Sequence, residues 1–279
     1  MVFRQYRIKS ESALSLPEDY VREGVFFDIE TTGFKASSSH VYLVGAAYFA
    51  GDEWILSQWM TEGPGEEKAL LLTFAQFLRP FGRIIHFNGD RFDIPYMREK
   101  YAWHQLNDPF TALKSTDIFR DVRVLKNILS LERLNQKTLE CFLGICREDR
   151  YDGGTLINVY RGYVREPSPD ALHLLLLHNR EDVQGMLALT GLYAYLYALG
   201  FLEDEAKLRG AGSGEADEAD HGWKAVKDTM KDTMKDIVDT FFILLLFDPG
   251  NIAPKGFIII FLERFPHYFP VASCPLQAQ

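Results

Sequence analysis

The sequence predicts an α/β fold in which helices flank a mixed β-sheet. Two β-rich segments, His40–Ala50 and Glu53–Met60, are separated by Gly51-Asp52, a pair typical of a hairpin turn. Further along the chain, helical and strand patterns alternate. A hairpin followed by alternating strands and helices indicates antiparallel and parallel strands in one sheet, with helices packed against it.

The individual elements follow from local composition and periodicity. Gly24–Ile29 is a short β-rich run that ends in acidic residues, and Arg83–Phe87 is a compact apolar strand. Glu66–Leu78 has apolar residues at helical spacing and is followed by Pro80. The remaining expected elements are a helix over Asp93–Trp103, a short strand over Leu113–Phe119, helices over Asp121–Leu129 and Asn135–Leu143, and a loop at Tyr151–Gly154.

A long helix is predicted to begin at Ser168-Pro169-Asp170. A serine cap, a proline at the first helical position and an acid in the first turn are all favourable at a helix N-terminus. The helical pattern continues to Gly200, and glycine commonly ends a helix.

Four regions are expected along the chain. Residues 1–20 are an N-terminal extension, and residues 21–202 form the α/β domain. Residues 203–222 are an acidic, glycine-containing linker. Residues 223–279 form a poorly defined C-terminal appendage, whose pattern indicates no role and no particular protein partner.

The sequence indicates where in the cell the protein is expected. The N-terminal stretch MVFRQYRIKS lacks the apolar core of a signal peptide. The longest apolar runs, Phe241–Phe247 and Phe257–Leu262, are too short to span a bilayer. The three cysteines fit neither a disulfide framework nor a zinc signature. We therefore expect a cytoplasmic protein with no membrane segment.

The net charge of −9 does not exclude a nucleic-acid partner. The segment from Glu203 to His221 holds seven acidic and two basic residues, so it accounts for −5 of that total. Part of the remaining −4 comes from Asp28, Glu30, Asp93 and Asp182, four acids that are candidates for holding cations. Bound cations would neutralise their charge. The charge argues only against tight, nonspecific binding in a basic groove.

Asp28 and Glu30 are the first candidate pair for metal chemistry. Residues two apart on a strand face the same side, so both carboxylates would project together from the end of an apolar strand. Such a pair is costly unless a metal or another partner satisfies it. The alternative is an ordinary exposed strand end.

Asp93 is the second candidate. In the stretch from His86 to Met97 a strand ends, a glycine turn follows and Asp93 opens a helix, while Asn88 caps or braces the turn. Asp90 competes with Asp93, although its pattern is that of a solvated turn residue. The alternative for Asp93 is a first-turn acid favoured by the helix dipole.

His178 and Asp182 are the third candidates. They are four residues apart, so they share one face of the long helix, whose flanking residues are mostly apolar. The alternatives are a core histidine with satisfied hydrogen bonds and an aspartate paired with a nearby arginine.

Three segments, taken in order, resemble the motifs of the DnaQ-like (DEDD) 3′–5′ exonucleases. They are FFDIETTGF, FNGDRFDIP and HNREDV. More narrowly, NGDRFDIP, SLERLNQKTLECFLGICREDRYDGG and HNREDVQGM resemble the YprB-type ribonuclease-H-like domain. The resemblance covers about Val21 to Leu199. It implies a ribonuclease-H-like mixed sheet flanked by helices and a two-metal nuclease site that acts on a DNA or RNA 3′ end.

The resemblance also implies roles for individual residues. Asp28, Glu30, Asp93 and Asp182 would hold two divalent ions, Mg²⁺ or Mn²⁺, and His178 would complete the catalytic set. Further implied or candidate substrate contacts are Thr31, Thr32, Gly33, Phe34 and Asn88, with Phe34 placed to meet a base.

One position departs from the DEDD pattern. His178 lies four residues before Asp182, where the tyrosine class has its tyrosine, whereas the histidine class usually has five. This leaves two roles open for His178, general base or orienter of water. Alternative functions are a ribonuclease-H-like endonuclease or resolvase, a catalytically idle nucleic-acid-binding module, and a protein-interaction scaffold.

Overall fold

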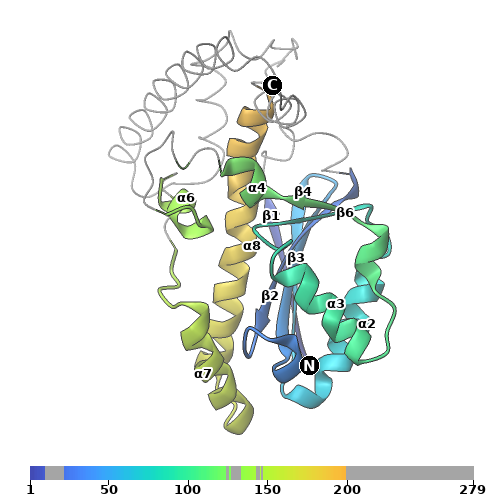
Figure 1. The fold of residues 1–279 in the computed structure, drawn as a ribbon. Helices are drawn as coiled ribbons and strands as arrows, with labels where there is room; N and C mark the ends of the chain where they lie inside the picture. Colours follow the sequence, from blue (N-terminus) through green and yellow to red (C-terminus); the bar gives the residue numbers. More distant parts are fainter. Residues whose placement is uncertain (10–21, 124–125, 127–132, 143–144, 146, 199–279) are drawn as a thin grey trace, which may run out of the picture.

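The computed structural model describes residues 1–9, 22–123, 126, 133–142, 145 and 147–198. These residues form a six-stranded sheet with helices on both faces (Figure 1). The strand order is β1-β4-β3-β2-β5-β6. The strands are β1 (Val2–Lys9), β2 (Gly24–Thr31), β3 (Val41–Ala50), β4 (Glu53–Met60), β5 (Arg83–His86) and β6 (Lys114–Asp117).

The sheet is mixed, as the sequence predicts. β1, β4, β3 and β2 pair antiparallel to their neighbours, whereas β5 is parallel to both β2 and β6. Gly51 has a φ of 70° in the β3–β4 hairpin turn, a left-handed conformation that glycine adopts at little cost. β2 is therefore a central strand where the antiparallel and parallel halves meet.

β1 differs from the sequence prediction, which places residues 1–20 in an extension outside the domain. Val2 to Lys9 pair with β4 along its whole length, from Met60 to Glu53. The signal in the sequence is a short alternation in which Val2, Tyr6 and Ile8 are partly buried while their neighbours are exposed.

Helices cover the two faces of the sheet in different pairs. α2 (Glu67–Leu78) and α3 (Asp93–Trp103) pack on one face, with a core that includes Phe27 and Ile29 of β2. α7 (Gly153–Arg165) and α8 (Pro169–Ala198) cover the other face, where Tyr42 and Leu43 of β3 belong to the core (Figure 1). Shorter helices are α4 (Ile118–Val122), α6 (Gln136–Phe142) and the 3₁₀ turns Ala36–Ser38, Pro64–Glu66 and Pro109–Ala112.

Several predicted boundaries agree closely with the structure. α3 spans the predicted residues, and Ser168 Oγ accepts a hydrogen bond from the Ala171 amide at 3.1 Å, as a cap of α8 should. α7 is a helix that the sequence analysis does not predict, because the pattern at its start is typical of a loop. Asp152 caps it by accepting a hydrogen bond from the Thr155 amide at 2.8 Å.

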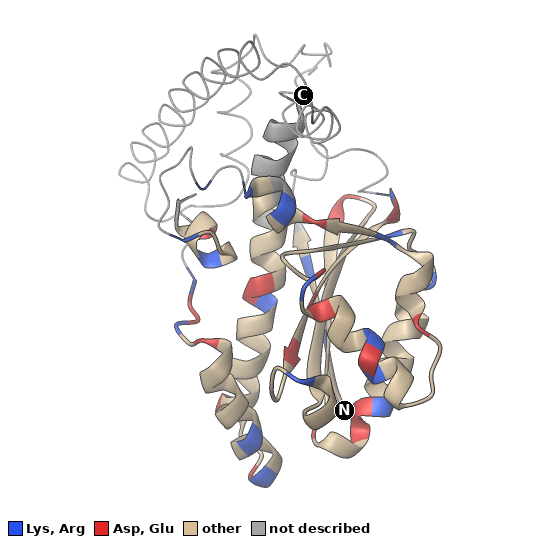
Figure 2. Cartoon of the chain, viewed as in Figure 1, with Lys and Arg blue, Asp and Glu red and all other residues tan. Residues whose placement is uncertain are grey.

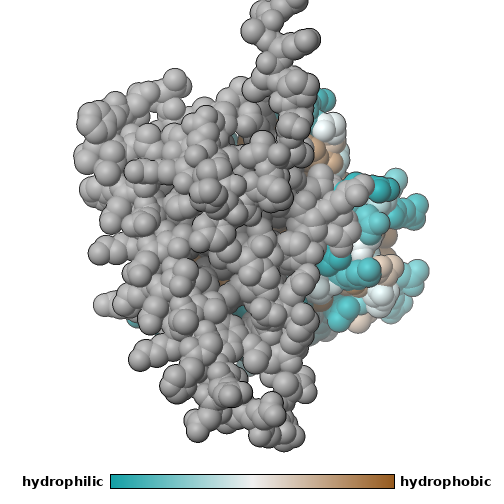
Figure 3. Space-filling model, turned by 90° about the horizontal axis from the view of Figure 1, so that it is seen from above, coloured by the Kyte–Doolittle hydropathy of each residue, from teal (hydrophilic) through white to brown (hydrophobic). Residues whose placement is uncertain are grey.

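The predicted linker and appendage, residues 203–279, lie outside the described residues. Within the described part, no helix combines the length and the apolar character needed to cross a bilayer. The portion of the described surface that is visible from above is mostly hydrophilic (Figure 3).

Candidate metal centre

β2 positions the first two carboxylates. Asp28 and Glu30 point to the face covered by α8, because the residues between and beside them, Phe27 and Ile29, pack into the opposite core. Glu30 retains only 8% of its surface exposed. Two acids are thus held on one side of a central strand, close to its C-terminal end.

Asp93 reaches β2 from the start of α3. Its Oδ1 accepts a hydrogen bond from the Ile29 amide at 3.3 Å, which places it beside the strand at the level of the other two acids. The preceding turn is tightly built: Asn88 has a φ of 63°, and its amide donates to Asp117 Oδ1 at 2.7 Å. A Cβ on Gly89 would lie 2.7 Å from His86 Cγ, so glycine is required there.

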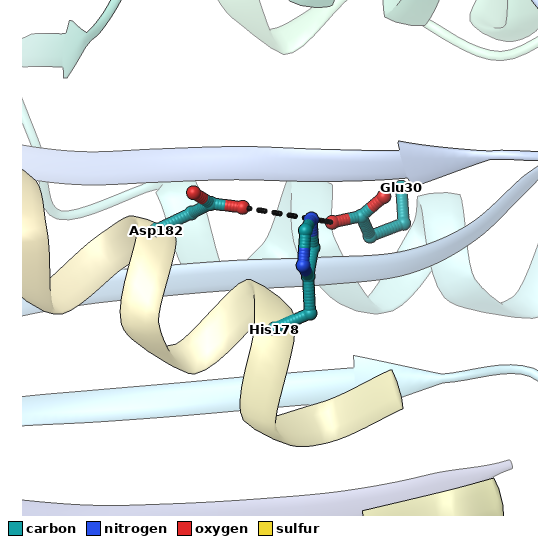
Figure 4. A group of neighbouring side chains, drawn as sticks. All are labelled: Glu30, His178 and Asp182. Atoms are coloured by element: carbon teal, nitrogen blue, oxygen red, sulfur yellow. Dashed lines mark ion pairs between the residues drawn. The ribbon is translucent and has the colours of Figure 1, made fainter. Parts of the chain in front are cut away.

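α8 contributes His178 and Asp182 from one face, one helical turn apart. His178 Nε2 lies 3.6 Å from Glu30 Oε1 and 3.3 Å from Asp182 Oδ2 (Figure 4). Ligand atoms of these three side chains all lie within 4.8 Å of one another. The imidazole therefore points into the space between two carboxylates that come from different elements.

The acids repel one another. Burial is the largest cause that raises the pKa of Asp28 and of Glu30 well above their ordinary values, and the charges of Asp182 and Asp93 raise both further. Burial also raises the pKa of Asp93 to about 7. Bringing such groups together in the ionised state costs free energy unless a cation lies among them.

The donor set fits a hard divalent cation. Mg²⁺ and Mn²⁺ prefer carboxylate oxygens, and Asp28, Glu30, Asp93 and Asp182 supply these from three elements. The observation in this structure that favours a bound cation is geometric: ligand atoms of Glu30, His178 and Asp182 all lie within 4.8 Å of one another.

Asn179 locks α8 onto the strand that carries Asp28. Its Nδ2 donates to Asp28 Oδ2 at 3.0 Å, and its Oδ1 accepts from Gln58 Nε2 at 2.8 Å. Gly45 lies opposite Asp28 on β3, and a Cβ there would stand 2.1 Å from Asn179 Oδ1. The glycine is therefore what allows the amide to reach the sheet.

Arg147 holds the other side of the centre. Its Nη1 donates to Asp182 Oδ1 at 2.6 Å, while Nε and Nη2 donate to the two oxygens of Glu140 at 2.5 and 2.7 Å. Burial opposes its charge, but the bonds to Glu140 and the charge of Asp182 outweigh burial and raise the pKa of Arg147. Asp182 thus has the arginine partner that the alternative interpretation requires, and its second oxygen faces His178.

Asp149 orients His178. Its Oδ2 lies 2.5 Å from His178 Nδ1, which leaves Nε2 towards Glu30 and Asp182. Burial alone would raise the pKa of Asp149, but hydrogen bonds from the Tyr151 amide and His178 hold it below its ordinary value. A carboxylate that accepts a hydrogen bond from Nδ1 fixes the ring and its tautomer, so Nε2 is the nitrogen that carries no hydrogen in the neutral imidazole.

The predicted substrate residues lie around the end of β2. Thr31 Oγ1 donates to the Gly33 carbonyl at 3.0 Å, and Thr32 is buried. Phe34 is 85% exposed and meets Phe92 edge-on at 6.2 Å between ring centroids. These residues stay predictions as substrate contacts.

Sequence reasoning does not find three polar residues at the centre: Asn179, Arg147 and Asp149. Asn179 lies inside the HNREDV segment, directly after His178. Nothing in that position indicates that its side chain hydrogen-bonds Asp28. Arg147 and Asp149 lie in the REDRYDGG stretch, whose only signal is its family resemblance. A run of charges before a helix gives no indication that it folds back onto α8.

A family model described as the RNase_H superfamily matches residues 25–197. The matched segment runs from β2 to the last described turn of α8, so it includes every residue of the centre. This chain belongs to the ribonuclease H superfamily.

Among individual proteins, the chain is similar to the uncharacterized protein YprB of Bacillus subtilis (strain 168). The two are 27% identical over 168 residues, which is 59% of this chain and 40% of YprB. The match thus covers well under half of that relative.

Two solved structures show partial similarity to the chain. The family B DNA polymerase of the archaeon Pyrobaculum calidifontis gives a TM-score of 0.46 at 15% identity, over 63% of this chain and 24% of the polymerase. Exonuclease I gives 0.37 at 15% identity, over 58% of this chain and 45% of that protein.

Proposed function

We propose that the protein is a metal-dependent 3′–5′ exonuclease that hydrolyses phosphodiester bonds of DNA or RNA. The observation that carries the proposal is that ligand atoms of Glu30, His178 and Asp182 all lie within 4.8 Å of one another, with Asp28 and Asp93 close enough to act on the same acids electrostatically. The carboxylates repel one another in the absence of a cation. Membership of the ribonuclease H superfamily supports it.

Two Mg²⁺ or Mn²⁺ ions on these four acids would supply Lewis acidity, activating water and stabilising the departing oxyanion. The chain itself fixes the geometry. Asn179 holds one oxygen of Asp28, and Arg147 holds one oxygen of Asp182. Both carboxylates are thereby fixed before any substrate arrives, which is the kind of preorganisation that lowers a reaction barrier.

His178 is the proposed proton acceptor. Asp149 holds Nδ1, so Nε2 is the atom available to take a proton from the attacking water. The Asp149 carboxylate would stabilise the imidazolium that results. This proton transfer would need no movement of the imidazole ring, because Nε2 already faces Glu30 and Asp182.

The test of the metal site is hydrolysis of an end-labelled strand with Mg²⁺ or Mn²⁺, with and without a chelator. Asp28→Asn keeps the side chain's shape but removes ligand charge, and turnover should fall by several orders of magnitude. Asp90→Asn is the matched control, because Asp90 is exposed on the turn and bonds Ser115 instead. A folded Asp28→Asn protein with full activity would overturn the assignment.

The products of hydrolysis show whether the protein digests a strand from its 3′ end or cuts within it. Release of mononucleotides from a free 3′ end, abolished by a bulky 3′ block, is the expected result. Rapid cutting of a circular single strand would instead identify an endonuclease.

His178 and Asp149 are tested together. His178→Ala should lower turnover by about 10²–10⁴-fold, and the acid limb of the pH–rate profile should disappear with it. Asp149→Asn should lower turnover less and displace that limb. Near-normal turnover by a folded His178→Ala protein would limit the histidine to a packing role.

A further inference from the structure

A pocket lies beside the metal centre, between α7 and the segment that follows β2. Its volume is about 330 Å³. The lining residues that matter here are Thr32, His40, Tyr160, Arg161 and Arg165. Thr32 is two residues beyond Glu30, so the pocket and the centre share a short piece of backbone.

Two arginines form the charged wall of this pocket. Arg161 and Arg165 are one turn apart on α7, and the helix Gly153–Arg165 contains no acidic residue. Both are exposed, and the lower part of α7 carries blue, basic positions in Figure 2. Within the described residues, neither makes an ion pair with a carboxylate, and Arg161 makes a single long hydrogen bond, to the Thr32 carbonyl at 3.5 Å.

This arrangement costs the folded protein free energy. Like charges one turn apart on a helix repel each other, and no ion pair in the described part of the chain offsets that repulsion. Guanidinium groups are planar donors that match the oxygens of a phosphate in pairs. The missing counter-charge therefore has the chemistry of a phosphate anion.

Two further lining residues, Tyr160 and His40, contact neighbouring side chains. The Tyr160 ring stacks on Tyr42 with centroids 4.1 Å apart, and its hydroxyl lies 2.7 Å from Thr61 Oγ1. His40 Nδ1 lies 3.2 Å from Thr32 Oγ1, whereas its buried Nε2 has no hydrogen-bond partner among the described residues. A buried polar atom without a partner is unusual and points to a missing partner such as water or a ligand.

We propose that Arg161 and Arg165 bind a backbone phosphate of the nucleic-acid strand whose reacting phosphodiester lies at the metal centre. The inference rests on the proposed function. In the bound complex the strand would lie from the end of β2 across α7. Arg161 and Arg165 line the pocket and are both exposed to solvent, which suits a polymer that must enter and leave.

Fluorescence anisotropy of a labelled single-stranded oligonucleotide, with Ca²⁺ in place of Mg²⁺ to prevent hydrolysis, tests the proposal on the full chain. The variant is Arg161→Gln/Arg165→Gln. The matched control is Arg79→Gln/Lys114→Gln, which removes two exposed cations, one just after α2 and one at the start of β6, neither of which lines the pocket. Neither variant should melt below the parent protein, and the pocket variant should melt slightly above it, because the repulsion between Arg161 and Arg165 is removed.

The pocket variant should bind about tenfold more weakly or worse, a loss of about 1.4 kcal/mol, because both guanidinium groups and their charge-assisted hydrogen bonds to phosphate oxygens are removed. The slope of log affinity against log salt should become shallower by about 0.7 for each phosphate that the variant no longer binds. The control should retain parental affinity and slope.

Equal affinity of the pocket variant and the control would overturn the proposal while leaving the proposed function intact. A parent protein that binds no oligonucleotide would instead refute the proposed function itself. Titration with inorganic phosphate provides the third arm. Loss of phosphate binding in the pocket variant, with oligonucleotide affinity unchanged, would identify a site for a free anion and overturn the strand assignment.

Discussion

Gly45→Ala should displace Asp28 of the candidate centre, because the added methyl group would clash with Asn179, the residue that hydrogen-bonds Asp28. The added Cβ would stand 2.1 Å from Asn179 Oδ1, 2.9 Å from Asn179 Cγ and 3.0 Å from Val183 Cγ2. The two separations from Asn179 cannot persist, so α8 must shift away from the sheet or the amide must rotate. Either movement breaks the bonds from Gln58 to Asn179 and from Asn179 to Asp28.

The cost has two parts. Overpacking a well-packed interior costs about 1–3 kcal/mol, and each buried polar group left without a partner costs about 1–3 kcal/mol. Gln58 and Asn179 have no exposed surface, so water cannot replace the broken bond. We expect the free energy of unfolding to fall by roughly 2–6 kcal/mol, and hydrolysis to fall because Asp28 loses its support.

Urea unfolding followed by circular dichroism measures the loss. Gly162→Ala is the matched control, because a Cβ there meets nothing within 4 Å, and alanine in a helix should add about 0.5–1 kcal/mol of stability. Asn179→Ala removes the obstacle, so Gly45→Ala/Asn179→Ala should cost clearly less than the sum of its single changes. Strict additivity, or a Gly45→Ala protein within about 0.5 kcal/mol of the parent, would refute the reasoning.

Three further predictions concern the ion pairs and the acids. Arg147→Met leaves Glu140 buried without its partner, and urea unfolding should show a loss of about 3–5 kcal/mol; a loss below about 1 kcal/mol would mean that the pair is solvent-screened. Gly185→Ala would place a Cβ 1.7 Å from Glu140 Oε1, so nuclease assays should show lower turnover through a displaced Asp182, and unchanged turnover would contradict that coupling. The pKa of Asp93 is raised to about 7 from about 3.9 in an unfolded chain. Its contribution to metal-free stability is therefore greatest below about pH 4 and is lost as the pH rises through about 7. Calorimetric titration with Mg²⁺ should show affinity that rises over the same range together with proton release, and pH-independent binding would contradict it.

Much of the fold can be predicted because its elements carry strong local signals. The β3–β4 hairpin has its glycine turn, and α8 has its capping serine and proline. The start of α7 escapes prediction because Gly153-Gly154 is typical of a loop, although Asp152 caps the helix through Thr155. Edge strand β1 escapes it because half of its residues face solvent.

For the candidate site, sequence reasoning finds the acids and the histidine but not what holds them. Asp28 and Glu30 are separated by two positions on a strand, and His178 and Asp182 by four on a helix, so local geometry brings each pair together. The link from Asn179 to Asp28 spans 151 positions. Such a contact depends on how α8 crosses the sheet, and one sequence taken alone contains no periodic pattern that encodes it.

The long separation between the parts of the centre has a consequence during protein synthesis. A nascent chain that has emerged only as far as α7 contains Asp28, Glu30 and Asp93, but it lacks Asp182, His178 and the amide of Asn179. The early acids then have neither their fourth member nor the helix that fixes them. Under the proposed function, hydrolytic competence would arise only when α8 has been made and has docked on β2, so an unfinished chain on the ribosome would hydrolyse no nucleic acid.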